Sequence, residues 1–468
     1  MAEEAEERAS GDTVSVAKPE GEDTLRKVPD VELILDGFGF MPEANQFKSA
    51  KELKKIYKTS KEESSQSPCA SSTNIDIVRR YTWKTRNRMT VQVITYGATI
   101  TTIQVPDKKG VPDDVIAGFD TLEEYFQPAN PYFGATIGRY ANYIREGTMV
   151  VQPSGRMYML SHNRGHNHYN GGHVGFDKVN WRSYVNGNKV VMSHISERFH
   201  EGYPGTVMAQ VTFEVTCDNT LKIEMKCHTS EPTIVNLSNA LYFNLAGHHA
   251  GPEQMCEHII TINADKYTAV DDEGLATGEK NVVGGTAYDF RVPRVLRGML
   301  PRIPMGGYDV NYCITQGTEQ DLSFQARALH PITGRVVEVY STQSGMQFYT
   351  GNLLPDPDKI VEEPRAEEES QEEEVKEESD SGSESSDKWS ANGEEAGEES
   401  KGKKSYGYVP LLGKKGTFYR KHGLFCLMPQ NYPDAVNHKN FPNSILNPGE
   451  VYVHKIQYKF GLLLGKYV

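Results

Sequence analysis

The sequence contains few cysteines, no long apolar run and no surplus of positive charge. Its 6 cysteines are spread over 468 residues, without the close pairs of a metal site or the regular spacing of a disulfide framework. This distribution favours free thiols in a reducing compartment. No segment is apolar over the length of a membrane span, and the first residues lack the basic and apolar regions of a signal peptide. We therefore predict a soluble cytoplasmic protein without membrane contact.

Negative charge is concentrated in one segment. The formal net charge is −13, and residues 361–400 contain 17 Asp and Glu against 3 Lys and Arg, a balance of −14 that leaves +1 for all other residues. An acidic segment repels phosphate, and the rest of the chain is almost neutral. The sequence therefore excludes nucleic acid as an expected partner.

The same region interrupts the pattern of the chain. Residues 355–404 are of low complexity and rich in Glu and Ser, so they cannot bury enough apolar surface to fold. We predict a disordered acidic insertion. It could act as a charged flap beside a cleft or bind a basic protein partner, but an inert solvated loop is the favoured interpretation.

Short alternating segments dominate the rest of the chain. Apolar residues alternate over 207–215, a turn follows at Asp218-Asn219, and alternation resumes over 221–227, a pattern that predicts an antiparallel hairpin with one buried face. The same period recurs over 91–93, 337–339, 451–453 and 456–460. No long stretch has the period of a helix, so the class is all-β, a large antiparallel sandwich.

This pattern of alternating segments sets two domain boundaries. Residues 1–74 are charged and Ser-rich, apart from a patch around Leu33 to Phe47, and they predict a mostly disordered tail. Residues 75–468 form the predicted sandwich domain, interrupted by the insertion.

One stretch mixes polar and apolar residues in an unusual way. In Thr233–Gly247, Asn236, Asn239, Tyr242 and Asn244 are set among Val, Leu and Phe. Buried amides need partners or a polar ligand, so these groups either face a sugar-binding pocket or cap strand ends inside the core. Composition alone favours capped strand ends.

Seven ordered stretches carry a resemblance. They are Tyr96–Ile100, Asn130–Ile144, Gly165–Trp181, Thr233–Gly247, Gly307–Asn311, Tyr340–Asn352 and Phe425–Asn437. Together they resemble the galactose mutarotases, also called aldose 1-epimerases. The resemblance implies a large β-sandwich of galactose-mutarotase type, a hexose ligand, and no metal or organic cofactor.

The resemblance also implies a reaction that this chain is poorly equipped to perform. Interconverting the α and β anomers of a hexose requires a base at the C1 hydroxyl and an acid at the ring oxygen. The family's acid, a His, falls on Ala240, and its base, a Glu, falls on Met428. Neither side chain can carry a proton, and losing one such group typically costs about 10²–10⁴ in rate.

Other sugar-contacting positions are retained or replaced by polar and aromatic residues. The resemblance places a substrate His at Asn170 and a substrate Arg at Tyr143, whereas the remaining positions match. The predicted substrate-binding residues are Asn142, Tyr143, Asn170, Tyr242, Asp309 and Gln347. They either keep a sugar-binding cleft or now only satisfy the core, and we weigh these two interpretations evenly.

Histidines offer a possible substitute for the lost groups. His166 and His168, two residues apart on a predicted strand, share one face with Asn170 if side chains alternate. His168 could then transfer a proton, although a structural histidine is the favoured interpretation. A metal site that adds His248 and His249 is not expected, because no acidic or Cys residue stands at ligand spacing.

These observations lead to two hypotheses of different classes. The favoured one is a catalytically impaired homologue, a pseudoenzyme that acts by binding a hexose or a protein partner. The alternative is a working aldose 1-epimerase with displaced catalytic groups, such as His168 with Asp309.

Overall fold

The computed structural model describes residues 29–42, 76–151, 154–303, 306–316, 322–356 and 410–465. Most of the predicted tail, Cys69 and nearly all of the predicted insertion lie outside these ranges. The other five cysteines are unpaired. Within the described ranges, no helix is long and apolar enough to cross a membrane.

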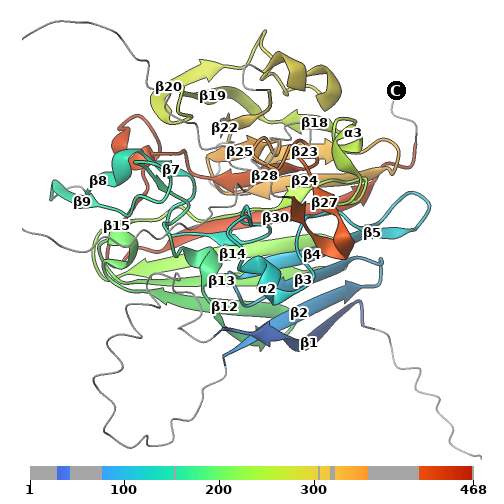
Figure 1. Ribbon diagram of the computed structural model, residues 1–468, viewed down its shortest axis with the longest axis horizontal. Helices are drawn as coiled ribbons and strands as arrows, with labels where there is room; N and C mark the ends of the chain where they lie inside the picture. Colours follow the sequence, from blue (N-terminus) through green and yellow to red (C-terminus); the bar gives the residue numbers. More distant parts are fainter. Residues whose placement is uncertain are drawn as a thin grey trace, which may run out of the picture.

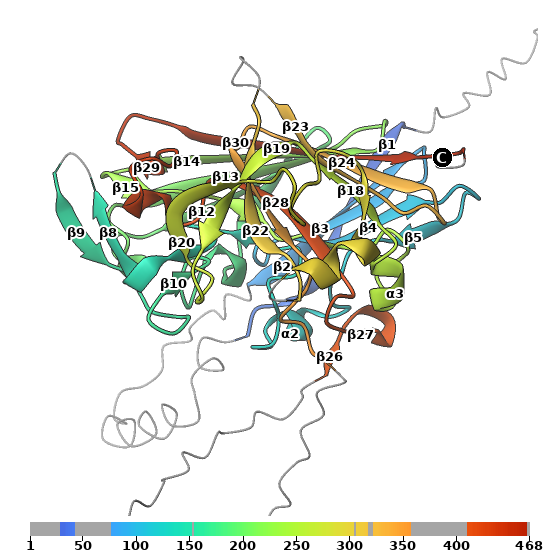
Figure 2. The same ribbon diagram turned by 90° about the horizontal axis from the view of Figure 1, so that it is seen from above.

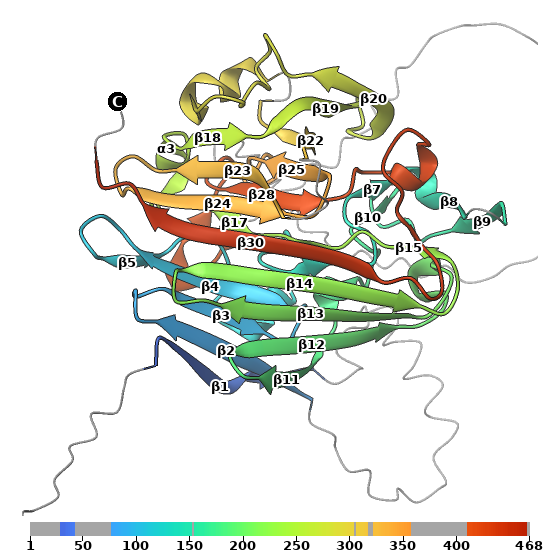
Figure 3. The ribbon, with the colours of Figure 1, turned by 180° about the vertical axis from the view of Figure 1, so that it is seen from behind.

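One layer of the fold is a nine-stranded sheet, which Figure 3 shows from behind. Its strands, in spatial order, are β11 (Arg182–Asn186), β12 (Lys189–Ser196), β13 (Val207–Val215), β14 (Thr220–Thr229), β30 (Tyr452–Leu462), β24 (Arg335–Ser341), β23 (Ser323–Leu329), β18 (Ile259–Ile262) and β21 (Arg294–Val295). The last element of the chain, β30, therefore lies in the middle of the sheet. All its neighbours pair antiparallel.

The predicted hairpin is the clearest success of the alternation rule. β13 and β14 pair from Val207 opposite Thr229 to Val215 opposite Leu221. The alternating apolar residues of both strands are buried, while their neighbours face outward. Asn219 closes the turn at φ +61°, a conformation that Asn tolerates better than most residues.

The second layer consists of two sheets that lie side by side in front of the first (Figures 1 and 2). The five-stranded sheet contains β1 (Val31–Phe40), β2 (Ile77–Thr85), β3 (Thr90–Ile94), β4 (Thr99–Pro106) and β5 (Pro112–Asp114). The six-stranded sheet contains β17 (Tyr242–Phe243), β28 (Phe425–Gln430), β25 (Gly345–Tyr349), β22 (Asp309–Ile314), β19 (Ala264–Val270) and β20 (Ala276–Val282). Just beyond β5, Ile116 forms an isolated bridge with Phe243 of β17 and so links the chain between the two sheets.

The main core fills the space between the layers. Val91 from the five-stranded sheet, Phe213 from the nine-stranded sheet and Phe348 from the six-stranded sheet belong to one buried cluster. Every pairing between named strands in the described ranges is antiparallel. The predicted all-β antiparallel sandwich is therefore confirmed.

Two expectations need correction. The strand β1 pairs with β2 over nine residue pairs, so residues 31–40 are ordered and the expected disorder of the 1–74 tail is wrong for them. The second error concerns Val451 and Val453, which are largely exposed, whereas His454, Ile456 and Tyr458 are buried. The predicted alternation over 456–460 has its apolar residues buried, including Phe460, whereas the apolar residues of 451–453 face outward.

Candidate functional site

The candidate site lies on the outer face of the six-stranded sheet. Strand alternation divides each of its strands between two faces. In β25, Met346 and Phe348 enter the core between the layers, so Gln347 and Tyr349 face away from it. The same division holds for β22 and β28, because Val310 and Leu427 enter that core.

Strand register brings the outward side chains into rows. Residues directly opposite one another share a face of the sheet. One row runs across four strands and consists of Tyr242, Cys426, Tyr349 and Asp309. The next row consists of Met428, Gln347 and Asn311. Three predicted binding residues and the predicted base position therefore meet on one surface, although they are up to 186 positions apart in the chain.

Asp309 and Gln347 form the polar centre of this surface. Gln347 Nε2 donates a hydrogen bond of 2.6 Å to Asp309 Oδ1. Asp309 keeps an accessible surface, and the surrounding protein desolvates its carboxylate. Desolvation raises the pKa of Asp309 to about 6, against the opposing effects of Gln347 and Arg164. This carboxylate is therefore poised to accept hydrogen bonds near neutral pH.

A tyrosine wall borders the polar centre. The short strands β7 (Tyr143–Ile144) and β10 (His168–Tyr169) pair with Tyr143 opposite Tyr169, and the centroids of these two rings are 4.5 Å apart. The Tyr132 ring lies edge-on to Tyr169 with centroids 6.1 Å apart. Desolvation raises the pKa of Tyr143, so its hydroxyl stays a donor. Flat rings of this kind suit the CH face of a sugar.

The side chains of Asn142 and Asn170 hydrogen-bond the backbone beside the tyrosine wall. Asn142 N donates to Asn170 Oδ1 at 2.8 Å, and Tyr143 N donates to Asn142 Oδ1 at 2.9 Å. Both asparagines have positive φ angles, which their short polar side chains tolerate. Their side-chain oxygens are thus committed to the backbone, and the Asn170 side chain also hydrogen-bonds the Tyr132 hydroxyl.

The adjoining Gly171-Gly172 pair has a steric explanation. A Cβ on Gly171 would lie 1.9 Å from the carbonyl oxygen of Gly138. Glu201 then fixes the loop, because its carboxylate accepts hydrogen bonds from the His173 and Val174 amides at 3.0 and 2.9 Å.

His168 does not reach the cleft. It pairs with Ile144 on the opposite face of the β7–β10 ladder and is fully buried. Its Nδ1 lies 2.7 Å from the Ser161 carbonyl oxygen and its Nε2 lies 2.6 Å from the Tyr203 hydroxyl. Burial lowers the pKa of His168 to about 4. These contacts are those expected of a structural histidine, the favoured interpretation, and they do not direct His168 toward a substrate.

The expected common face of His166, His168 and Asn170 also fails. The strand is only two residues long, His166 is exposed, and Asn170 turns at φ +48°. A period of two cannot be extended through a turn.

The amides of the Thr233–Gly247 stretch are mostly structural. Asn236 Oδ1 accepts from Asn431 N at 2.8 Å, Asn239 Nδ2 donates to Gly134 O at 3.0 Å, and Asn244 Nδ2 donates to Gly423 O at 3.0 Å. Of the polar residues in this stretch that the sequence marked, Tyr242 is the one on the cleft face.

Four residues near the cleft escaped the sequence analysis. They are Arg164, Tyr169, Asn311 and Tyr349. Asn311 and Tyr349 stand two positions after Asp309 and Gln347 on the same strands, so strand alternation would have found them. Arg164 lies on a turn and offers no periodic signal.

With this geometry established, comparison with known proteins identifies the family. A family model described as aldose 1-epimerase matches residues 79–459. The chain belongs to the aldose 1-epimerase family.

Relatives carry the names expected of that family. The human galactose mutarotase is 39% identical over 372 residues, which are 80% of this chain and 91% of the relative. The bovine galactose mutarotase is 37% identical over 376 residues, or 80% and 92% of the two chains. The aldose 1-epimerase of Haemophilus influenzae is 31% identical over 277 residues, covering 58% and 78%.

Solved structures agree on the fold. A GalM/aldose epimerase homologue from C. elegans superposes with a TM-score of 0.64 at 24% identity, covering 81% of this chain and 97% of the other. The galactose 1-epimerase from Lactobacillus acidophilus gives 0.62 at 19% identity, covering 84% and 97%.

Within this aldose 1-epimerase fold, Ala240 and Met428 lie in apolar surroundings. Ala240 is 2% exposed and shares a hydrophobic cluster with Tyr242 and Cys426, and Met428 packs against the same cluster. Phe133 closes the cluster beside Tyr242, with ring centroids 4.9 Å apart.

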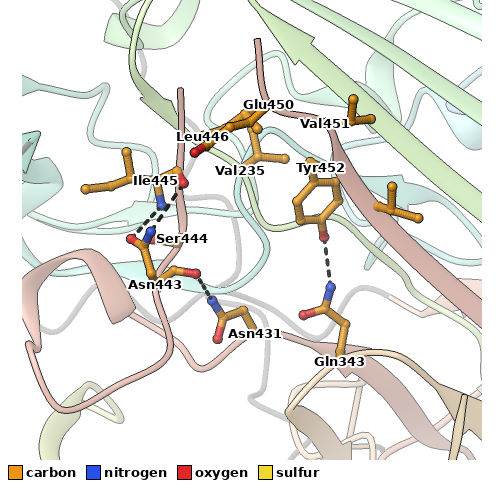
Figure 4. Close-up of a pocket in the computed structure, with 11 residues that line it drawn as sticks. Val235, Gln343, Asn431, Asn443, Ser444, Ile445, Leu446, Glu450, Val451 and Tyr452 are labelled. Atoms are coloured by element: carbon orange, nitrogen blue, oxygen red, sulfur yellow. Dashed lines mark hydrogen bonds between the residues drawn. The ribbon is translucent and has the colours of Figure 1, made fainter. Parts of the chain in front are cut away.

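A cavity of about 540 Å³ lies elsewhere, between β15 (Thr233–Ile234), β29 (Ile445–Leu446) and the start of β30. Figure 4 shows that several of its polar side chains turn toward one another. Gln343 Nε2 donates to the Tyr452 hydroxyl at 3.2 Å, and Asn431 Nδ2 donates to the Asn443 carbonyl at 3.2 Å. These groups are used within the wall, so we do not regard this cavity as the functional site. Nor does any group of three or more His, Cys, Asp or Glu in the described ranges suit a metal ion.

Proposed function

We propose that this chain binds a hexose in the cleft without interconverting its anomers at an enzymatic rate. The observation that carries the proposal is the combination of a retained Asp309–Gln347 pair with apolar side chains at positions 240 and 428. The Asp309–Gln347 pair offers hydrogen bonds to sugar hydroxyls. Proton transfer at C1 and at the ring oxygen would need acid and base groups at positions 240 and 428.

The polar centre suits a neutral polyhydroxyl ligand. Asp309 offers a carboxylate acceptor, and Gln347 continues the network toward Gln430 Nε2, which lies 3.5 Å from Gln347 Oε1. Asn311 adds an amide that is 2% exposed and whose two polar atoms have no partner among the described residues. A hydroxyl group both donates and accepts, so it would satisfy such an amide.

The test is the equilibration of freshly dissolved α-D-galactose, followed by polarimetry. We expect the rate with the native chain to equal that of buffer, while human galactose mutarotase serves as the positive control. A rate that rises in proportion to the concentration of native chain would overturn the proposal. Binding is measured in parallel by saturation-transfer NMR, where signal transfer to galactose should be weaker in Asp309→Asn than in the native chain.

One observation favours a second candidate, a weak aldose 1-epimerase that uses Asp309 as its base. The accessible carboxylate with a pKa of about 6 is matched to proton transfer near neutral pH. In that case the native chain would show a slow protein-dependent rate that Asp309→Asn abolishes. Ligand binding without this rate supports the first proposal instead.

A further inference from the structure

Arg164 places a cation against the tyrosine wall from a different part of the chain. Position 143, where the family resemblance expects a substrate arginine, holds Tyr143. The Arg164 guanidinium lies within hydrogen-bonding reach of the Tyr143 hydroxyl, and its Cζ is 5.8 Å from the centre of the Tyr169 ring. Stacking on an aromatic face pre-orients a guanidinium.

The charge of Arg164 is uncompensated. Lys178 makes a useful contrast, because its Nζ lies 5.4 Å from the Tyr132 ring but also 3.1 Å from the Asp177 carboxylate. Among the residues that the structure describes, no carboxylate forms an ion pair with Arg164, although this residue is exposed.

Asp309 lies near Arg164 without pairing with it. The two charges interact, since Arg164 acts on the titration of Asp309, yet the carboxylate is bonded to Gln347 instead. A ligand that contacts both side chains would place hydroxyl groups at Asp309 and a negative group at Arg164.

We propose that Arg164 selects an anionic monosaccharide, a sugar that bears a carboxylate or a phosphate, for the cleft. This inference rests on the proposed function, because it assumes that a sugar occupies the surface around Asp309. It names Arg164 as the specificity-determining residue and distinguishes the cleft from one that holds a neutral hexose alone.

The experiment is isothermal titration calorimetry on the full chain with D-galactose, D-galacturonate and D-galactose 6-phosphate. We expect at least one anionic sugar to bind about tenfold more tightly than galactose, the effect of a charge-assisted contact. Arg164→Gln should abolish that preference while changing galactose affinity less than about threefold. Arg156→Gln is the matched control, because Arg156 also stacks on a tyrosine, Tyr158, with Cζ 5.2 Å from its ring centre. Both residues lie in the separate two-stranded sheet of β8 (Thr148–Val151) and β9 (Arg156–Met159).

The outcomes separate the two proposals. Galactose that binds as tightly as both anionic sugars, or a preference that survives Arg164→Gln, overturns the role of Arg164 and leaves the proposed function standing. Failure of all three sugars to bind overturns both. Which anionic sugar binds more tightly identifies the negative group.

Discussion

The cleft face of the six-stranded sheet has two halves with different chemistry. On β22 and β25 it presents Asp309, Asn311 and Gln347, and on β17 and β28 it presents Tyr242, Cys426 and Met428. The first half is polar and partly unsatisfied, while the second belongs to a hydrophobic cluster or packs against it. The two halves lie on adjacent, continuously paired strands, so one can change its chemistry while the other keeps its hydrogen bonds.

The proposed function separates holding a sugar from moving its protons within one fold. In this proposal, ligand contacts depend on Asp309 and its neighbours, which register places together. Proton transfer would depend on positions 240 and 428, where apolar side chains leave the strand pairing intact. Substitutions on either half therefore test the division.

The largest expected effect comes from restoring both proton-transfer groups. The double variant Ala240→His with Met428→Glu should interconvert galactose anomers about 10²-fold or more faster than the native chain, since each general acid or base typically contributes that much. Polarimetry measures the rate. Ala240→His with Met428→Gln is the matched control, because Gln has nearly the shape of Glu but cannot accept the proton.

A folded double variant without activity would contradict the division, because it would mean that the polar half no longer positions a hexose. Thermal unfolding must accompany the assay, since a new carboxylate enters apolar surroundings and burying a charge is costly. Measuring galactose binding to the same variant distinguishes a variant that no longer binds the sugar from one that binds it without turnover.

The next effect is on stability, and it separates the cleft from the core behind its wall. His168→Gln should lower the free energy of unfolding by about 2 kcal/mol, because it disturbs two buried hydrogen bonds. The folded pKa of about 4 lies below the ordinary 6.5, so native stability should fall as pH drops from 6.5 toward 4, and the variant should lose less over this window. Urea unfolding at several pH values measures both. Unchanged galactose binding is expected, and a large loss of binding would place His168 in the site after all.

Much of this architecture could be predicted from the sequence, but only where local periodicity carries the information. The β13–β14 hairpin followed from alternating apolar residues, and the outward face of β22 could have been extended from Asp309 to Asn311 by the same rule. The exposure of Val451 and Val453 could not be predicted in this way, because both faces of that stretch carry bulky residues and tertiary packing chooses between them.

The candidate site was predictable to a lesser degree. The resemblance located Asp309, Gln347 and the replaced positions, but motifs do not say which side chains are already used by the backbone, as Asn170 is. Neither strand alternation nor the family resemblance predicts a role for Arg164. It reaches the cleft from a turn, and only the three-dimensional path of the chain brings it beside Tyr143.

A smaller effect is expected from the carboxylate of the polar half. Asp309→Asn should weaken galactose binding about tenfold, because a charged acceptor typically gives a stronger hydrogen bond than an amide oxygen. Calorimetry measures this loss, with Glu214→Gln on the nine-stranded sheet as the control, since its pair with Lys189 is partly exposed and worth little. Equal affinities for native and variant chains would assign the sugar to another surface.

The smallest effect is a pH dependence of galactose binding. Asp309 must be ionised to act as a charged acceptor, and desolvation raises its pKa to about 6, so galactose affinity should fall severalfold as pH is lowered from 7.5 to 5. The groups that face Asp309 do not confound this window. Arg164 stays charged, Gln347 does not titrate, and burial raises the pKa of Tyr143, Tyr169, Tyr242, Tyr349 and Cys426.

An anionic sugar should behave differently over the same pH range. Protonation of Asp309 removes a negative charge that repels it, while Arg164 keeps attracting it, so its affinity should fall less than that of galactose or should rise. Calorimetry on galactose and galacturonate at three pH values provides the comparison, and Asp309→Asn should flatten both profiles. Parallel profiles for the two sugars in the native chain would mean that charge at Arg164 and charge at Asp309 do not act on the same ligand.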